Sequence, residues 1–451
     1  MIESERVENL NPSEPRNREA VLYWMQAAQR VRYNHALELA IRTANERKKP
    51  LVVGFGLTDI FPNANLRHYR FMLEGLQEVD AALARIGIRF ILRIGSPDTV
   101  AIALSRKADL VITDAGHLRI QRQWRNAVAS VIDCPLLEVE TNLIVPVLTA
   151  ADKEMYSAGV FRPRIHRCLP QFLVPLPSGK PRLSSMNLKI ASESPIDIDN
   201  LLNKLNIDRS VGPSPLFVGG EQQAHRLLDR FIDCKLDHYD KGHNDPTKDY
   251  QSDLSPYLHF GHISPLEIAL YVGEKNSPAA DAFLEQLIVR RELSSNFVRF
   301  NARYDQYDGL PDWARRSLNT HRKDTRTYRY SRDQLEQAQS HDPYWNAAQK
   351  QMVMTGKMHG YMRMYWGKKI LEWSKTPQEA FATALDLNDK YELDGRDPNG
   401  FAGVAWCFGK HDRPWSRRPI FGNIRYMNDA GLRRKFDADQ YVQTILDLER
   451  Q

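Results

Sequence analysis

Short apolar segments alternate with amphipathic ones over the first 150 residues of the chain. Five segments are short and apolar enough to be strands: 21–25, 51–55, 89–94, 109–113 and 136–139. Between them apolar positions recur with helical spacing, as in 31–47 and 66–86, which predicts amphipathic helices. Because strands that alternate with helices form parallel sheets covered on both faces, the pattern predicts an α/β, doubly wound, Rossmann-like N-terminal part.

The second half of the chain carries longer segments, and their spacing is helical. These segments lie at 220–236, 265–272, 279–300, 333–339, 345–357, 361–374 and 377–389. Between about 149 and 215 the periodicity is lost and Pro, Ser and Gly collect, which is typical of an ordered surface connector. We therefore expect an α/β domain at 1–148, a connector at 149–215 and an all-α domain at 216–451.

Composition agrees with two folded domains and narrows the class of protein. A chain of 451 residues exceeds what one core normally serves, and 42% hydrophobic residues supply enough apolar surface. The sequence has no apolar run of about 18 residues, and its polar start lacks the pattern of a signal peptide. Four cysteines lie far apart without a CxxC pair, so neither a disulfide framework nor a metal site is expected. A soluble protein of the cytoplasm is the expectation.

Positive charge is concentrated near the C-terminus. The whole chain carries a formal charge of +6, which by itself does not identify a nucleic-acid partner. The stretch 410–435 alone holds eight Lys or Arg and two acids, a balance of 8 − 2 = +6. Its cations alternate with Trp415, Phe421 and Tyr426, a combination that suits phosphate contacts and base stacking. A solvated basic loop is the alternative.

Three tryptophans stand out in the segment DPYWNAAQKQMVMTGKMHGYMRMYWGKKILEW at 342–373. Trp366 and Trp373 are seven positions apart, so on a helix they share a face about 10 Å apart, and Trp345 lies upstream. Indole rings at such separations could pass an electron stepwise from a buried redox cofactor to the surface. Aromatic residues at helical spacing are more often simply core, and the spacing does not decide between the two.

Together with LDGRDPNGFAGVAW at 393–406, this segment resembles the class II cyclobutane pyrimidine dimer photolyases, flavoproteins of the photolyase/cryptochrome family. Further stretches of the same family character are VLYWMQAAQRVRYNHAL, NANLRHYRFMLEGL, SDLSPYLHFGHISP, VRREL and GNIRYMN, so the resemblance covers nearly the whole chain. It implies a lyase that uses light and reduced FAD to split pyrimidine dimers in double-stranded DNA. It also implies electron transfer through Trp366, Trp345 and Trp373, in that order, to reduce an oxidised flavin.

The string SDLS at 252–255 offers hydroxyl and amide groups just before a helical stretch, which suits a diphosphate, although it is also a common helix cap. A reduced flavin anion further needs an arginine paired with a carboxylate nearby. Where the wider superfamily has an asparagine opposite flavin N5, this chain has Gly400, and the segment LNDKYELDG offers Asn388 instead. The resemblance therefore assigns the cofactor to Tyr239, Ser252, Leu254, Ser255, Arg363, Asn388 and Asp394.

For the lesion, the resemblance assigns Glu285 to the dimer carbonyls, since a carboxylic acid there would steady the radical anion. The alternative for Glu285 is an ion pair with Arg290 or Arg291 on the adjacent turn. Met364 and Trp406 would form an apolar wall, and Arg413 and Arg425 would contact the DNA. Many photolyases clasp the dimer between two tryptophans, but the region around Val289 has no second one.

Three alternatives from other classes remain. A cryptochrome-like photoreceptor would keep flavin and tryptophans but often carries a C-terminal extension, whereas this sequence ends at Gln451 soon after a helical stretch. Repair of the (6-4) lesion usually relies on active-site histidines. A DNA- or nucleotide-binding protein without activity would be colourless. The string GFG at Gly54 lacks the spacing of a dinucleotide-binding fingerprint. The N-terminal domain of a photolyase can hold an antenna chromophore of deazaflavin or folate type, and the residues do not say which. A monomer is expected.

Overall fold

The computed structural model describes residues 2–450 and contains one six-stranded sheet in the order β1-β6-β5-β2-β3-β4. The strands are β1 (Val7–Asn9), β2 (Ala20–Trp24), β3 (Leu51–Leu57), β4 (Arg89–Ile94), β5 (Ala108–Asp114) and β6 (Leu136–Val139). Strands β2 to β6 pair in parallel, and β1 pairs antiparallel to β6. The α/β prediction and its five strands are confirmed; β1 was missed because three residues are too few to show an alternating pattern.

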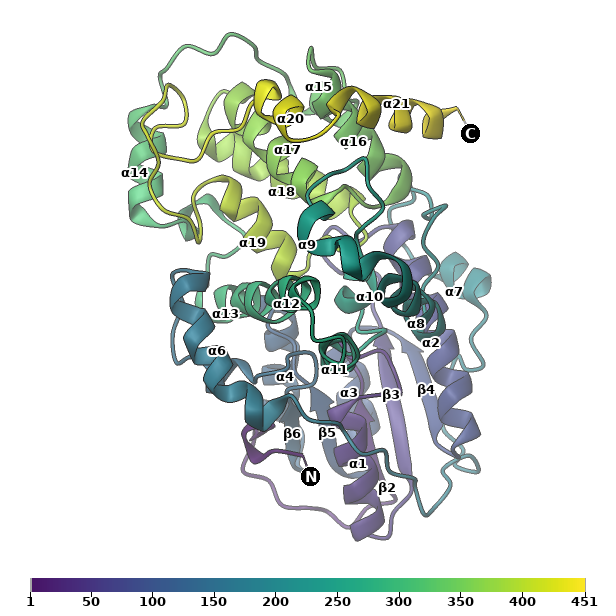
Figure 1. Ribbon diagram of the computed structural model, residues 1–451. Coiled ribbons are helices and arrows are strands. Elements are labelled where there is room, and N and C mark those ends of the chain that lie inside the picture. Colours follow the sequence, from purple (N-terminus) through teal and green to yellow (C-terminus); the bar gives the residue numbers. More distant parts are fainter. Residues whose placement is uncertain (1, 451) are drawn as a thin grey trace.

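Helices cover both faces of this sheet (Figure 1). On one face, α1 (His35–Glu46) and α2 (Leu66–Arg85) share a core cluster with Val21 and Tyr23 of β2. On the other face, α3 (Pro97–Ser105) and α4 (Arg119–Val131) pack with Leu22 and Trp24 of the same strand. Successive side chains of a strand point to opposite faces, so β2 is buried along its whole length and reads as a continuous apolar run.

The predicted connector contains more regular structure than its sequence suggests. Within 149–215 the chain forms α6 (Ala158–Phe172) and α7 (Ile198–Lys204), and α5 (Val147–Ala150) overlaps the start of this range. Pro163 and Pro170 lie inside α6 and made that segment look unstructured. The irregular part after α6 runs beside the edge of β4, where Ser185 accepts a hydrogen bond from the amide of Arg89. The connector thus covers one free sheet edge, which protects it from pairing with other chains.

The rest of the chain is helical and forms the opposite end of the molecule (Figure 1). Its helices are α8 (Glu221–Arg230), α9 (Tyr239–Gly242), α10 (Ser255–His259), α11 (Pro265–Gly273), α12 (Pro278–Leu284), α13 (Arg291–Phe300), α14 (Asp312–Thr320), α15 (Arg332–Glu336), α16 (Pro343–Thr355), α17 (Gly360–Trp373), α18 (Pro377–Tyr391), α19 (Pro398–Cys407), α20 (Asp429–Lys435) and α21 (Ala438–Glu449). Two π-helical segments, Phe231–Lys235 and Glu285–Arg290, interrupt long helices. The all-α prediction is confirmed, while α9, α14, α19 and α20 were not foreseen.

Side chains at the start of α2 close the ends of two helices in the helical part. Asn65, Arg67 and His68 donate hydrogen bonds to three consecutive carbonyl groups at the end of α18, those of Lys390, Tyr391 and Glu392, at 2.7, 2.8 and 3.0 Å. Arg67 also donates to two carbonyl groups near the end of α16, those of Met352 and Val353. The last carbonyls of a helix lack partners within it and carry partial negative charge, so a guanidinium is a favourable cap.

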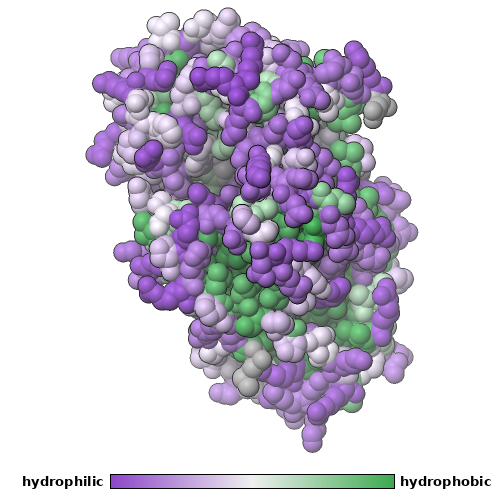
Figure 2. All heavy atoms as spheres, in the orientation of Figure 1, coloured by the Kyte–Doolittle hydropathy of each residue, from purple (hydrophilic) through white to green (hydrophobic). Residues whose placement is uncertain are grey.

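An apolar patch lies on one face of the molecule. On the face seen in Figure 2, hydrophilic residues cover most of both ends, and apolar residues gather near the middle of the molecule, around α11. Between residues 2 and 450, no helix is long and apolar enough to cross a membrane.

Candidate functional site

A cavity of about 870 Å³ lies within the helical part and is the main candidate site. A volume of this size is in the range that holds a cofactor. The predicted site residues that line it are Tyr239, Ser252, Leu254, Ser255, Arg363, Met364, Asp394, Trp406 and Arg425. Predicted residues outside its lining are Glu285, Asn388, Trp345, Trp366, Trp373 and Arg413. The structure therefore brings residues from α9, α10, α17 and α19 to one wall.

One end of the cavity suits an anionic group. Ser252 and Ser255 line it, and Leu254 is the residue that precedes α10. Between them Asp253 has a left-handed backbone with φ of 59°, and its carboxylate forms ion pairs with Lys235 and Lys357. Burial disfavours the charged carboxylate, but the two lysines hold the pKa of Asp253 below its usual range. Two hydroxyl groups and Lys357 thus face the cavity beside a segment held rigidly in place.

Arg363 on α17 reaches two buried carboxylates. Its Nη2 lies 2.9 Å from Oε2 of Glu392 and 3.1 Å from Oδ1 of Asp394. Burial raises the pKa of Glu392 to about 8. Burial acts on Asp394 in the same direction, yet Arg363 and a hydrogen bond from Ser255 hold the pKa of Asp394 below its usual range. The sequence indicated the pair of Arg363 with Asp394; Glu392 was missed, although it lies only two residues before Asp394.

Buried polar atoms in and around the site that have no hydrogen-bond partner among residues 2–450 include Nε of Arg363 and Oδ1 of Asn388. The Nδ2 group of Asn388 donates to Oδ1 of Asp389 at 3.0 Å, and the same oxygen accepts the backbone amide of Arg396 at 3.0 Å. Because that oxygen is an acceptor, the amide of Asn388 is fixed with its own oxygen free. Orphaned buried groups of this kind call for a ligand, and a flavin ring offers both donors and acceptors.

Asn388 itself lies behind the cavity wall. It is only 1% exposed, and a Cβ atom at Gly400 would come within 3.2 Å of its Nδ2. That is tighter than ordinary contact, so a larger residue at position 400 would press on the amide of Asn388. Gly400, which stands where the superfamily has its asparagine, therefore leaves the room that Asn388 occupies.

Glu285 is not among the residues that line the cavity. Its carboxylate accepts hydrogen bonds from Arg162 at 2.7 Å and from Arg290 at 3.2 Å, and these arginines hold its pKa below the usual range despite burial. The ion pair with Arg290 is the alternative that the sequence left open for Glu285. Gln286 and Arg290 line the cavity instead. Both belong to the π-helical turn Glu285–Arg290, and such turns are frequent at functional sites.

Cations and aromatic rings alternate along the mouth of the cavity. Arg425 lies over the rings of both Trp406 and Trp415, with its Cζ 5.6 and 4.9 Å from their centroids. Arg413 also lies over Trp415, with its Cζ 5.4 Å from the centroid of that ring. Lys435 also lines the cavity. The basic stretch predicted from the sequence thus borders the site rather than lying apart from it.

The three predicted tryptophans form one continuous series. The rings of Trp366 and Trp345 are stacked with centroids 6.4 Å apart, and Trp345 and Trp373 lie 5.6 Å apart, edge to face. Trp345 is therefore the middle ring, and its Nε1 donates to the carbonyl of Trp366 at 3.0 Å. Trp366 follows Arg363 and Met364 on α17, whereas Trp373 adjoins the half-buried Tyr330. The series therefore leads away from the cavity; its role in electron transfer stays a prediction.

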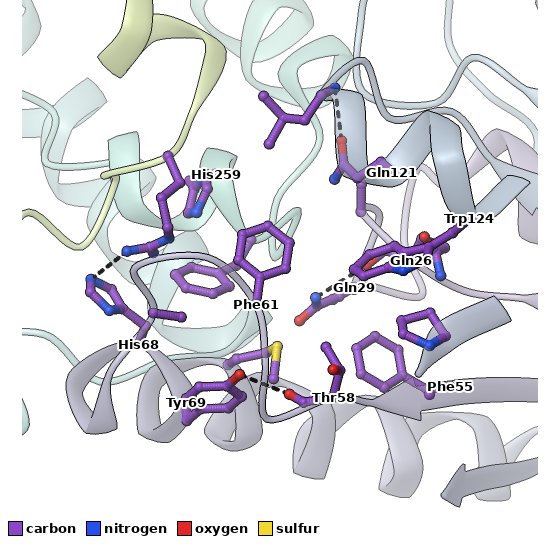
Figure 3. A pocket seen from close by; sticks show the side chains of 18 residues that line it. Gln26, Gln29, Phe55, Thr58, Phe61, His68, Tyr69, Gln121, Trp124 and His259 are labelled. Atoms are coloured by element: carbon purple, nitrogen blue, oxygen red, sulfur yellow. Dashed lines mark hydrogen bonds between the residues drawn. The ribbon is translucent and has the colours of Figure 1, made fainter. Parts of the chain in front are cut away.

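A second, smaller pocket of about 120 Å³ lies between the sheet and the helical part. In Figure 3 Phe55 and Trp124 lie on one side of the pocket and His259 on the other, with the ring of Phe61 between them. Gln26 and Gln29 add amide groups to a largely aromatic lining. It lies beyond the end of β3, where ligands of doubly wound sheets commonly bind.

Comparisons with known proteins place this chain in a family. The family model described as DNA photolyase matches residues 21–182. A deoxyribodipyrimidine photo-lyase from Methanothermobacter thermautotrophicus is 52% identical over 99% of this chain and 99% of its own length. A protein of the same name from Potorous tridactylus is 41% identical over 95% of this chain and 81% of its length.

A solved structure supports the same fold across both parts of the chain. It is the structure of an archaeal photolyase from Sulfolobus tokodaii with two FAD molecules, which is described as implying a novel light-harvesting cofactor for that protein. It aligns with a TM-score of 0.71 over 94% of this chain and 89% of its own, at 16% identity. Half of the residues of this chain are identical to those of the Methanothermobacter photo-lyase over nearly the full length of both proteins. This chain therefore belongs to the DNA photolyase family.

Proposed function

We propose that this protein repairs cyclobutane pyrimidine dimers in double-stranded DNA by light-driven electron transfer from reduced FAD. The observation that carries the proposal is the cavity that joins an Arg363–Asp394 pair to the basic, aromatic mouth formed by Trp406 and Arg425. A group that would stabilise an anion and an opening that would face the DNA are thus parts of the same cavity. The relatives named deoxyribodipyrimidine photo-lyase support the same activity.

The residues of the cavity suit FAD from end to end. Ser252, Ser255 and Lys357 would hold the diphosphate, and Arg363 would place its positive charge beside the ring system. When bound and reduced, the cofactor supplies an electron donor that light can excite. Asp394 and Glu392 both contact Nη2 of Arg363 and fix the orientation of its guanidinium group.

The dimer must leave the base stack to reach this cavity, at a cost of a few kcal/mol that a damaged, kinked site lowers. Arg425 would take the place left in the duplex, with Arg413 contacting phosphate. Met364 and Trp406 would pack against the extruded bases. Gln286 also lines the cavity, and its uncharged amide would donate to the dimer carbonyls. Arg290 stands near the position where a second tryptophan was sought.

The decisive experiment follows dimer loss in an oligonucleotide incubated with reduced protein, in the dark and under near-ultraviolet or blue light. Loss only under light is the expected result. Loss in the dark, or no loss with reduced flavin bound, would exclude the function. Retention of flavin and photoreduction without any repair would favour the cryptochrome-like alternative.

We expect Gln286→Ala to lower the repair yield more than Glu285→Gln does. Gln286 lines the cavity, whereas Glu285 is occupied by Arg162 and Arg290, so that its effect on repair passes through Arg290. The repair yield per absorbed photon is measured for both variants at equal flavin content. If Glu285→Gln abolishes repair while Gln286→Ala keeps it, the original assignment of Glu285 to the dimer carbonyls holds and that of Gln286 is wrong.

The smaller pocket is our candidate for the antenna chromophore, a planar ring of deazaflavin or folate type. Its aromatic walls suit stacking, and its present volume is far below that of the flavin cavity, so the ring of Phe61 must move to admit such a ligand. Ala64→Trp would fill the pocket. It should remove a second absorption band of the purified protein and leave repair at wavelengths absorbed by flavin intact; a band that persists would rule out this pocket.

A further inference from the structure

Trp406 is a tryptophan that lies beside two positive charges. Nζ of Lys368 on α17 is 4.8 Å from the centroid of its ring, and Cζ of Arg425 is 5.6 Å from it. Lys368 is fully buried and donates to the carbonyl of Cys407 at 2.7 Å. Burial lowers the pKa of Lys368 to about 8, so its ammonium group is charged at neutral pH.

Neither cation has an ion-pair partner among residues 2–450, and this separates Trp406 from the predicted electron-transfer series. Lys369 lies over Trp373 at 5.7 Å, but Glu372 neutralises it at 2.7 Å. Trp366 has neutral neighbours: Trp345 stacks on it and Gln349 accepts its Nε1–H group. Trp366 and Trp373 therefore lack the unpaired cations that lie beside Trp406, and Asp412 acts on Lys368 only from beyond ion-pair distance.

Removing an electron from an indole leaves a ring cation. Positive charge within about 6 Å raises the energy of that cation, most strongly where little water screens it. Trp406 lines the cavity directly, whereas Trp366 does not. A cavity-lining indole is a ready electron donor to an excited oxidised flavin, so it would compete with Trp366. Tyr361, another oxidisable ring of the lining, also lies below a cation, Lys435 at 4.1 Å.

We propose that Lys368 and Arg425 keep Trp406 from being oxidised, so that photoreduction draws its electron only through Trp366. In the suppressed step, one electron would leave the Trp406 ring and reduce the flavin by one electron. With that step disfavoured, the electron comes from Trp366, then Trp345, then Trp373, which an external reductant restores. The lesion wall stays uncharged. This inference rests on the proposed function, because it requires flavin in the cavity.

The test uses the full-length flavin-bound protein with Trp366→Phe, in which the normal route is removed. Adding Lys368→Met should restore photoreduction and shorten the fluorescence lifetime of oxidised flavin. A further Trp406→Phe change should abolish both effects, and transient absorption should detect the tryptophan radical only before that change. Lys368→Arg, which retains the charge, should stay inert.

Arg425→Gln provides a second variant that does not alter the protein interior, because Arg425 is exposed. Arg299→Gln is the matched control, since it removes a cation from over Phe300, outside the cavity lining. If neither Lys368→Met, nor Arg425→Gln, nor both together restore photoreduction in the Trp366→Phe protein, the inference is overturned. A parent protein that binds no flavin would instead remove the proposed function.

Discussion

Trp366→Phe is expected to abolish photoreduction of oxidised flavin while leaving repair by chemically reduced protein unchanged. A phenyl ring gives up an electron far less readily than an indole, and Trp366 is the ring of the series that lies nearest in sequence to the cavity residues Arg363 and Met364. Repair itself needs only the electron already held by the reduced cofactor. Photoreduction is followed by the flavin absorbance under steady blue light with an added reductant.

The matched control is Trp313→Phe, which changes a half-buried tryptophan of the same part of the chain outside the series. It should photoreduce as the parent does. Photoreduction of the Trp366→Phe protein at the parental rate would show that electrons enter by another route and that the series serves only as core.

Arg363→Leu is expected to cost most of the bound flavin and about 3–5 kcal/mol of unfolding free energy, the usual effect of removing one partner from a buried ion pair. The change leaves Glu392 and Asp394 buried without their shared cation. The flavin-to-protein ratio and urea unfolding of the flavin-free protein measure the two losses separately. Arg363→Lys retains the charge and should recover part of both.

The loss should grow with pH. Burial already gives Glu392 a pKa of about 8, so its neutral form is favoured in the folded protein, and stability falls as pH rises from the unfolded value of 4.5 toward 8. Without Arg363 the pKa of Asp394, now held low, would also rise through burial. The two proteins should therefore differ more at pH 8 than at pH 5. A gap that is constant with pH would mean that Arg363 acts through packing rather than charge.

Much of the α/β part could be predicted because strands β2 to β6 alternate with helices, and β2, β3 and β5 are buried along their whole length. Strand β4 and helix α2 were placed almost to the residue. Asn65 caps α2 and Ile86 ends it, signals that are local in sequence. Strand β1 and helix α6 were missed because a three-residue strand and a helix with two prolines carry no such local signal.

The lesion side of the site resisted prediction for a geometric reason. Counting along a regular helix would assign Glu285 and Gln286 to faces about 100° apart, but the π-helical turn adds a residue and rotates the following side chains. Nothing in FLEQLIVRREL marks such a turn. The sequence therefore indicated the right segment, and only the structure assigns Gln286 and Arg290 to the cavity wall.

Glu392 and the orientation of Asn388 were beyond reach for another reason. Both depend on contacts: Glu392 accepts from the amide of Met358, and Asn388 donates to Asp389, whose oxygen also accepts from the amide of Arg396. The position of the Glu392 carboxyl group and the free oxygen of the Asn388 amide follow from contacts in the folded protein, which residue types alone do not reveal.

The caps that α2 supplies to α16 and α18 bear on how this protein could evolve or be engineered. Arg67 and its neighbours satisfy backbone groups just ahead of Asp394, so the α/β part of the chain belongs to the scaffold that would position the flavin ring. A hybrid that joins the first half of one homologue to the second half of another would leave those carbonyls bare unless the first turn of α2 matched its new partner. We therefore expect a recombined protein to fold well only if the start of α2 and the ends of α16 and α18 come from the same parent.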